Sequence, residues 1–231
     1  MNAAAGCRVK APFGPRTALG TVLSVFEGEP ERALKSIAYL VDCEPILPRE
    51  LLDCAIWMSR RYAAPIGECI KAALPSFVKS FETPERPTLK PSERVPGEAA
   101  TQFSLTRGQN EAVQFLGERL AQKNFFGALL YGVPASGKTE VYLRLIRSAV
   151  KSGGQALFLL PEISLTLPFF DEFSASLGVP VALWHSRLTP RQRREAWLGL
   201  ARGDVKVVVG ARSASLLPFK DLRLAVLDEE Q

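Results

Sequence analysis

Residues 132 to 139 carry glycines, a lysine and a hydroxyl group at a spacing that can hold the phosphates of a nucleotide. They read GVPASGKT and fit the pattern G-x-x-x-x-G-K-[ST], in which backbone N–H groups of a tight loop and of the following helix start face phosphate oxygens. In this pattern Lys138 reaches the β- and γ-phosphates and the hydroxyl of Thr139 binds magnesium. The loop itself is formed by Gly132, Ala135, Ser136 and Gly137. A glycine turn with a solvated lysine is the alternative interpretation.

A nucleotide-hydrolysing site also needs a carboxylate for the metal and a group that aligns the attacking water. The apolar run 224–227 ends in Asp228 and Glu229. This places the two acids at the carboxyl end of a strand, which is the edge where ligands bind in open α/β sheets. We expect Asp228 to hold magnesium and Glu229 to polarise the water. A solvated acidic end of a strand is the alternative.

Gln109 lies near the start of a helix that the sequence predicts from Thr106 onwards. Its side-chain amide has both donors and acceptors, which is what reading the edge of an adenine requires. A glutamine at a helix start is often an exposed surface residue, so its position alone leaves both roles open.

The second half of the chain predicts an α/β domain with a parallel sheet. Short apolar runs alternate with helical periods, as in consecutive βα units whose strands are covered on both faces. The expected strands are 127–131, 156–160, 180–184, 205–209 and 222–227. The expected helices are one from Thr106, one directly after the phosphate loop, and two at 165–177 and 190–202.

The first half predicts a small, mainly-β domain with short helices. Its β-rich runs are 7–13, 19–26 and 37–41. A first helix is expected from Pro48 up to a stop at Pro65, and a second at 67–73. Because a three-stranded sheet is barely self-sufficient, the pattern indicates a further strand upstream.

A linker separates these two parts. Residues 81–102 keep no apolar period and contain the prolines Pro84, Pro87, Pro91 and Pro96 among charged residues. The expected domains are therefore residues 1–80 and 103–231.

Composition excludes several classes of protein. The 231-residue chain is 47% hydrophobic, which is enough for hydrophobic cores. Its net charge of +5 is compatible with a nucleic-acid partner, and equally with a basic surface that binds none. Cys7, Cys43, Cys54 and Cys69 share no C-x-x-C spacing and His185 is the single histidine, so no zinc set is readable. No apolar run approaches the roughly 18 residues of a membrane span, and the N-terminus has no secretory signal pattern. The cytoplasm is the expected compartment.

Five strings in the second half resemble, in order, the motor motifs of superfamily 2 helicases. They are 132–140 (GVPASGKTE), 159–166 (LLPEISLT), 184–186 (WHS), 210–214 (GARSA) and 227–231 (LDEEQ). Together they are similar to the PriA family of bacterial replication-restart helicases. Residues 6–14 and 62–75 resemble the 3′-DNA-binding domain of that family. The resemblance thus covers nearly the whole chain apart from the linker.

This resemblance implies a RecA-like P-loop domain that works as a 3′-to-5′ DNA helicase driven by ATP and Mg²⁺. Its implied substrates are single-stranded and forked DNA, and its implied partners are primosome proteins and the single-stranded-DNA-binding protein. Gln109 would then read adenine, and Lys138 would act in hydrolysis together with Asp228 and Glu229.

The same resemblance implies two sets of DNA-binding residues. The DNA path of the motor would include Pro161, Glu162, Thr166, Arg212 and Ser213. Gly14 and Lys35 would lie at the pocket for a 3′ end. A structural salt bridge for Arg212, a turn glycine and a surface lysine are the alternatives.

The chain also departs from the family pattern. Pro134 and Ala135 stand where the family usually has Thr and Gly, which removes one backbone N–H and stiffens the loop. Gln231 replaces a histidine, and the linker is too short for the family's winged-helix module. The family's first DNA-binding strand, its second lobe with the arginine finger, and its zinc-binding cysteines lie outside this chain. We therefore expect an N-terminal fragment that hydrolyses little ATP alone.

Two other functions fit parts of the sequence. A non-catalytic module that holds DNA ends or primosome partners would use the basic charge and the N-terminal part without the nucleotide site. A P-loop kinase is disfavoured because Asp228 and Glu229 supply a pair that positions water, while no site for a phosphate acceptor is visible.

Overall fold

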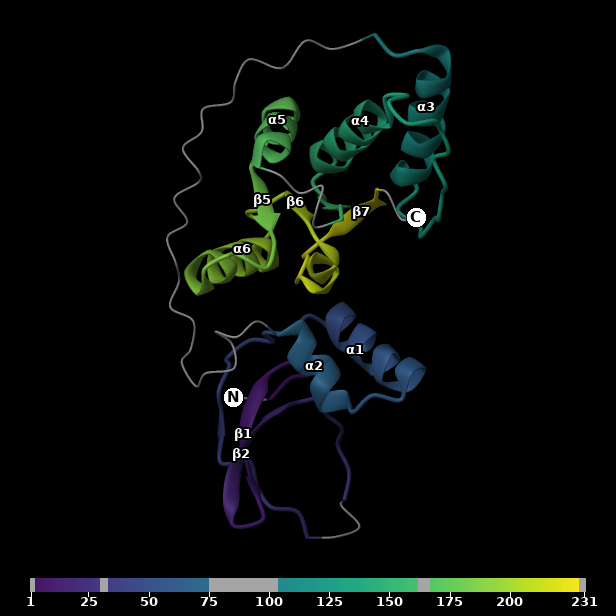
Figure 1. The fold of residues 1–231 in the computed structure, drawn as a ribbon. Helices are drawn as coiled ribbons and strands as arrows, with labels where there is room; N and C mark the ends of the chain where they lie inside the picture. Colours follow the sequence, from purple (N-terminus) through teal and green to yellow (C-terminus); the bar gives the residue numbers. More distant parts are fainter. Residues whose placement is uncertain (1–2, 30–32, 75–103, 162–166, 229–231) are drawn as a thin grey trace. The chain divides into compact units, whose positions relative to one another are not determined.

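The computed structural model describes residues 3–29, 33–74, 104–161 and 167–228 of the chain (Figure 1). Its contacts divide the chain into two compact units, Met1–Pro87 and Thr88–Gln231, and each is described by itself. The predicted linker, residues 81–102, lies outside the described residues. Within the described ranges, no helix is both long enough and apolar enough to cross a membrane.

The first unit contains a small antiparallel sheet followed by two helices. Its elements are β1 (Arg8–Phe13), β2 (Arg16–Thr21), β3 (Tyr39–Leu40), α1 (Arg49–Tyr62) and α2 (Ile66–Ala73). The three strands lie in the order β2-β1-β3. This confirms the prediction of a small, mainly-β domain with short helices.

The second strand begins earlier than the run at 19–26 predicts. A tight turn that begins at Gly14, with φ +59°, joins β1 to β2 and pairs Phe13 with Arg16. The turn of a hairpin fixes the register of both strands, so β2 starts at Arg16. The apolar pattern does not contain this information, and the predicted bounds of this strand are wrong.

A buried ion pair ties the start of β1 to the residues after β3. Arg8 donates from its backbone N and Nε to Oδ2 of Asp42, at 2.8 and 2.9 Å, and from Nη2 to Oδ1 at 2.7 Å. The two side chains are 2% and 5% exposed. Such a bidentate guanidinium–carboxylate pair is strong and directional, so it holds the end of β3 against β1.

The two helices of this unit share an apolar core. Its buried members are Leu47, Leu52, Ala55, Cys69, Ile70, Ala73 and Leu74. Pro48 and Pro65 stand directly before α1 and α2. The fixed φ and missing N–H of proline suit a helix start, which is why both predicted helices form where the sequence places them.

The second unit is built on a parallel sheet. Its elements are α3 (Arg107–Ala121), α4 (Lys138–Lys151), β4 (Gln155–Leu159), α5 (Leu167–Leu177), β5 (Val181–Trp184), α6 (Pro190–Arg202), β6 (Val207–Gly210), the 3₁₀ helix η2 (Arg212–Leu216) and β7 (Leu222–Leu227). The four strands lie in the order β5-β6-β4-β7 and all pairs are parallel. This confirms the predicted RecA-like α/β architecture.

Helices cover both faces of this sheet. Figure 1 shows α4 and α5 on one side and α6 on the other. On the α4–α5 side, Phe158 of β4 is fully buried and stacks on Phe173 of α5 with 4.9 Å between ring centroids. Apart from Gln155 in β4 and Arg223 in β7, the strands carry no polar side chains, as expected for a sheet that is covered on both faces.

The strand predicted at 127–131 does not form. The described residues 125–133 contain neither helix nor strand. Leu129 and Tyr131 are 89% and 91% exposed, and Leu130 packs only partly on the core. A strand needs a paired neighbour for its backbone groups, and the described pairing of the sheet ends at β7. Residues 127–131 therefore have the amino-acid composition of a strand but no neighbouring strand to pair with among the described residues.

Candidate functional site

The four parallel strands end together at one edge of the sheet. The register places their last residues in one row, formed by Leu159, Trp184, Gly210 and Leu227. The residues that follow each strand consequently lie along the same edge. This group includes Pro161, His185, Arg212 and Asp228. The carboxyl edge of an open α/β sheet is where ligands bind, so the topology itself gathers the predicted site residues.

The phosphate loop has the compact backbone that its sequence predicts. Gly137 caps α4 with φ +77°, and a Cβ on Gly132 would meet Oγ of Ser136 at 2.8 Å. Ala135 also has a positive φ, of +60°, a conformation that costs a residue with a Cβ about 1 kcal/mol or more. Nζ of Lys138 donates to the carbonyls of Gly132 at 2.9 Å and Val133 at 3.2 Å. The lysine thus points into its own loop, where phosphate oxygens would be bound.

Gln109 links the start of α3 to the phosphate loop. Its Oε1 accepts from the backbone N of Thr106 at 2.8 Å, and its Nε2 donates to the carbonyls of Ser136 at 2.9 Å and Gly137 at 3.5 Å. A Cβ on Gly137 would come within 2.4 Å of that Nε2. Oε1 keeps a second lone pair that can accept a hydrogen bond from an adenine amino group. Both N–H groups of Nε2 are already bound to loop carbonyls, so Nε2 can donate to adenine only if it releases one of them.

Asp228 and Thr139 reach the same region through α4. Oη of Tyr142 donates to Oδ1 of Asp228 at 3.4 Å, and Thr139 precedes Tyr142 by three residues, about one helical turn. Burial, together with the charge of Asp228 and this bond, raises the pKa of Tyr142 to about 12, so the hydroxyl remains a donor. The backbone N of Asp228 donates to the carbonyl of Leu159 at 3.0 Å, which fixes the residue beside β4.

The donor set around Asp228 fits Mg²⁺. A carboxylate and a hydroxyl are hard oxygen ligands, and Mg²⁺ is usually held by one or two such groups together with waters and substrate phosphates. Within the described ranges, no group of three His, Cys, Asp or Glu side chains forms a metal site without a nucleotide. Thr139 and Asp228 would therefore hold the ion together with the phosphates bound by the loop.

Three of the predicted residues lie outside the described residues: Glu162, Thr166 and Glu229. Pro161 is described and directly follows the carboxyl end of β4. Arg212 and Ser213 begin η2 after β6, and both are exposed. The structure thus places Pro161, Arg212 and Ser213 on the edge that also carries Asp228.

In the first unit, Gly14 lies in the turn between β1 and β2, and Lys35 precedes β3. β1 and β3 pair Lys10 with Tyr39, and the carbonyl of Lys10 accepts from the backbone N of Ala38 at 2.7 Å. Before Ala38, the described residues 33–37 form neither helix nor strand. Gly14 and Lys35 are both exposed, and no hydrogen bond joins them among the described contacts.

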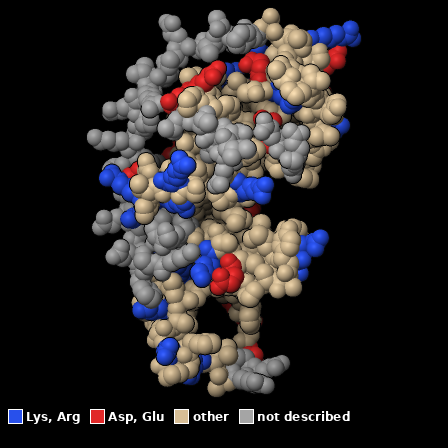
Figure 2. All heavy atoms as spheres, viewed as in Figure 1, with Lys and Arg blue, Asp and Glu red and all other residues tan. Residues whose placement is uncertain are grey.

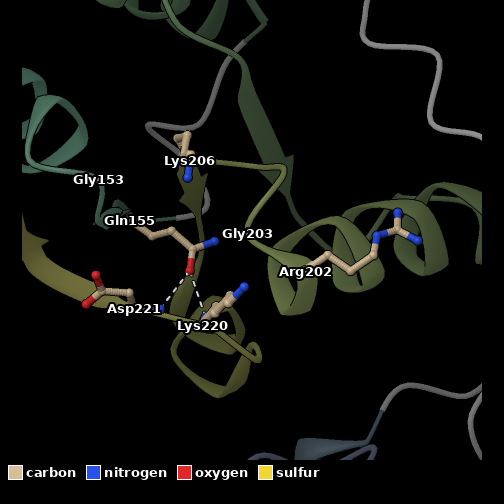
Figure 3. A pocket seen from close by; sticks show the side chains of 7 residues that line it. All are labelled: Gly153, Gln155, Arg202, Gly203, Lys206, Lys220 and Asp221. Atoms are coloured by element: carbon tan, nitrogen blue, oxygen red, sulfur yellow. Dashed lines mark hydrogen bonds between the residues drawn. The ribbon is translucent and has the colours of Figure 1, made fainter.

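Away from this edge, the described residues of the second unit also carry charged side chains and a pocket. Figure 2 shows Lys and Arg on the viewed face in small separate groups. A shallow pocket of about 250 Å³ lies at the amino ends of β4, β6 and β7 and includes Lys206 and Lys220 (Figure 3). Its central side chain, Gln155, is 1% exposed and is used structurally. Nε2 of Gln155 donates to the carbonyls of Leu200 at 3.1 Å and Val205 at 2.6 Å, and Oε1 accepts from the backbone N of Lys220 at 2.7 Å.

Sequence reasoning missed two residues that shape the carboxyl edge. Tyr142 could have been found from its helical spacing to Thr139, which points both side chains the same way. Arg193, which binds the loop after β5, gives no sequence signal, because an arginine in the first turns of a helix is ordinarily a surface residue. The capping box of Thr106 and Gln109 was readable from the S/T-x-x-E/Q pattern and explains the second use of Gln109.

Comparisons with known proteins agree with this geometry. The family model described as "3′DNA-binding domain (3′BD)" matches residues 1–75. The family model described as "DEAD/DEAH box helicase" matches residues 106–231. The chain belongs to the PriA family of DEAD/DEAH box helicases. It is 33% identical to replication restart protein PriA of Treponema pallidum over 236 residues, covering 99% of the chain and 35% of the relative. It is 32% identical to that of Rickettsia conorii, covering 97% and 33%, and 33% identical to that of Rickettsia felis, also covering 97% and 33%.

Membership of this family bears on both the nucleotide site and DNA binding. A helicase of this family uses ATP and Mg²⁺, and the 3′DNA-binding domain supports DNA binding. The chain spans about a third of the length of these relatives.

Proposed function

We propose that this chain is the nucleotide-binding and DNA-binding part of an ATP-driven, 3′-to-5′ DNA helicase of replication restart and primosome assembly. The observation that carries the proposal is the group at the carboxyl edge of the parallel sheet. There the loop that ends in Lys138 meets Gln109 on one side, and α4 meets Asp228 on the other. The proposed domains are 1–80 for DNA ends and 103–231 for the motor lobe, joined by 81–102.

Each residue of the motor site has a proposed task. Lys138 leaves its own loop carbonyls and binds phosphate oxygens, because a phosphate carries a full negative charge and attracts the ammonium more strongly than a neutral carbonyl does. Thr139 and Asp228 hold Mg²⁺, which supplies neutralisation of the phosphate charge when bound. Glu229 orients the attacking water. Gln109 reads adenine with the free lone pair of Oε1 while it holds the loop.

The DNA-binding residues are proposed on both units. Gly14 and Lys35 hold a 3′ end, since a turn glycine lets a strand approach the backbone and a lysine supplies charge. Arg212 and Ser213 contact the strand along the motor, where a guanidinium binds phosphate bidentately. Forked and single-stranded DNA are the proposed substrates. Primosome proteins and the single-stranded-DNA-binding protein, in the cytoplasm, are the proposed partners.

We also propose that the 231-residue chain by itself turns over little ATP. Its relatives are about three times as long, and an arginine finger contributes about 10³ to 10⁵ in rate where one is used. Nucleotide binding, rather than turnover, is therefore the sharper test.

The test is a titration with a fluorescent ATP analogue in the presence of Mg²⁺, comparing Lys138→Ala with Lys151→Ala. Both substitutions remove one charge from α4, but Lys151 lies in its last turn, far from the loop. We expect Lys138→Ala to weaken binding by about 10- to 100-fold, the effect of losing hydrogen bonds made by a charged group. Lys151→Ala should bind as the wild type does. Equal affinities of the two variants would overturn the nucleotide site.

A further inference from the structure

The loop between β5 and α6 is held in one shape by Arg193. Nη2 of Arg193 donates to the carbonyls of Ser186 at 2.8 Å and His185 at 3.3 Å, and its Nε donates to Leu188 at 3.3 Å. Its guanidinium lies 5.6 Å from the ring centroid of Trp184, which is 6% exposed. A planar fork that binds three carbonyls and stacks on a buried indole leaves the loop few alternative conformations.

Arg187 is carried by this loop and is available for a ligand. Its backbone N donates to Nδ1 of His185 at 3.1 Å, which fixes its position further. The side chain is exposed. Among the described residues, no acceptor or aromatic ring contacts its guanidinium.

Arg212 is available in the same way and starts from the adjacent strand. Trp184 pairs with Gly210 in the register, and the backbone N of Ala211 donates to the carbonyl of Trp184 at 3.2 Å. Neighbouring strands lie about 4.8 Å apart, so the loops that carry Arg187 and Arg212 leave the sheet side by side.

These two arginines differ from the others of the second unit. In its described part, five arginines form ion pairs with Asp or Glu. Three more contact aromatic rings or backbone carbonyls, and Arg194 also has a partner. Among the described arginines of this unit, Arg187 and Arg212 are thus the two whose guanidinium groups have no partner, and they lie on neighbouring loops at the carboxyl edge of the sheet.

We propose that Arg187 and Arg212 form a two-arginine site for the phosphates of a DNA strand, and that Arg193 is the positioning residue that holds Arg187 there. This inference rests on the proposed function and adds Arg187 and Arg193 to its DNA path. Guanidinium groups match phosphate oxygens in geometry as well as charge.

The place of the site in the sheet favours a DNA strand over the nucleotide. β5 is separated from β7 by three inter-strand spacings in the order β5-β6-β4-β7, or about 14 Å. Arg187 therefore lies well away from Asp228 along the edge. A polymer can contact both ends of such an edge, whereas a single nucleotide bound at the phosphate loop does not.

The experiment measures binding of fluorescein-labelled oligo(dT) by fluorescence anisotropy at several salt concentrations. Arg187→Gln and Arg212→Gln are compared with Arg202→Gln, which removes the same charge from an arginine that already pairs with Asp204. The series is repeated in a Lys35→Gln background, so that binding by the first unit does not mask the effect. Each site variant should lower the salt slope by about 0.7, which corresponds to a roughly fivefold loss of affinity near 0.1 M salt. Arg202→Gln should change neither value.

Arg193→Lys tests the positioning role while keeping the charge. A lysine cannot bind three carbonyls in one plane, so Arg193→Lys should weaken DNA binding as Arg187→Gln does. The double variant with Arg187→Gln should lose little more, because both changes disable the same contact. Full additivity would refute the positioning role.

Three outcomes would contradict these proposals, and they separate a failure of this inference from a failure of the proposed function. If Arg187→Gln binds DNA as Arg202→Gln does, while the wild type binds both DNA and nucleotide, only this inference fails. If the wild type binds no nucleotide, the proposed function fails with it. A binding site for inorganic pyrophosphate that is lost in Arg187→Gln, with DNA binding unchanged, would replace DNA by free phosphate as the ligand.

Discussion

The buried pair of Arg8 and Asp42 predicts a large and local loss of stability when one partner is neutralised. In Asp42→Asn the Arg8 guanidinium stays buried and loses its counter-charge, while one of its donors faces an amide NH₂ group. Breaking a buried pair in this way costs about 3–5 kcal/mol. The exposed pair of Arg49 and Asp53, whose side chains are 68% and 53% exposed, is the matched control in the same unit. Asp53→Asn should cost no more than about 0.5 kcal/mol.

The three tryptophans of the chain make this measurable without separating the units. Trp57 lies on α1 of the first unit, whereas Trp184 and Trp197 are buried in the second. Labelling with 5-fluorotryptophan and following ¹⁹F resonances in urea therefore reports each unit by itself. With a slope of about 1–3 kcal/mol per M, Asp42→Asn should move the Trp57 midpoint down by on the order of 2 M and leave the other two resonances unchanged.

The double variant Arg8→Met/Asp42→Leu separates loss of charge pairing from loss of packing. Replacing both partners by apolar residues removes the buried charge, so most of the stability should return. It should not return completely, because the backbone N of Arg8 also donates to Asp42, and a buried N–H without an acceptor costs about 1–3 kcal/mol. If Asp42→Asn and Asp53→Asn gave the same Trp57 midpoint, the ion pair would not be what holds the sheet.

Three further predictions concern the second unit. Ala135→Gly should stabilise it by about 0.5–1 kcal/mol in urea, because relief of the positive φ exceeds the added freedom of the unfolded chain; a lower midpoint would refute this strain. Because the pKa of Tyr142 is raised to about 12, its contribution to stability is complete below pH 10 and lost between pH 10 and about 12. Tyr142→Phe should therefore show a smaller loss than the wild type in that window, and equal losses would contradict the assignment. Gln155→Glu should cost about 3 kcal/mol or more, since a carboxylate would face the carbonyls that Nε2 now binds, whereas the same change at exposed Gln114 should stay within about 0.5 kcal/mol in the same unfolding assay.

The elements of the second unit were predictable where their signals are local. α6 begins after Thr189 with a proline at its first turn and ends before Gly203, which has φ +83°, and its predicted bounds are confirmed. The start signal, the stop signal and the helical period all lie within the segment itself. The run at 127–131 has the composition of a strand, but a strand also depends on a neighbour that composition does not specify.

The sequence predicts which residues form the candidate site, but it does not predict which of their side chains contact one another. The motif fixes Lys138, and the parallel topology places Asp228 at the same edge of the sheet. The hydrogen bond between Tyr142 and Asp228 joins residues 86 positions apart, and the direction of each side chain depends on packing that no local pattern contains. The same holds for Arg193, whose acceptors are backbone carbonyls and so leave no trace in residue types. Sequence patterns therefore identify the groups that perform the chemistry, while the groups that position them depend on the tertiary structure.

The phosphate loop is held from two directions, and these two sets of bonds respond differently to a phosphate. Lys138 binds the loop from within, through the carbonyls of Gly132 and Val133, whereas Gln109 binds it from α3, through the carbonyl of Ser136. A phosphate competes for Lys138, because both offer the ammonium an acceptor. It competes far less for Gln109, because the amide of Gln109 carries no charge that a phosphate would attract. Lys138 gains bonds to the phosphate but loses its bonds to the loop carbonyls, so its contribution to the binding free energy is the difference between the two. We therefore expect the effect of Lys138→Ala near the lower end of the 10- to 100-fold range. Gln109 keeps the shape of the loop on both sides of that exchange.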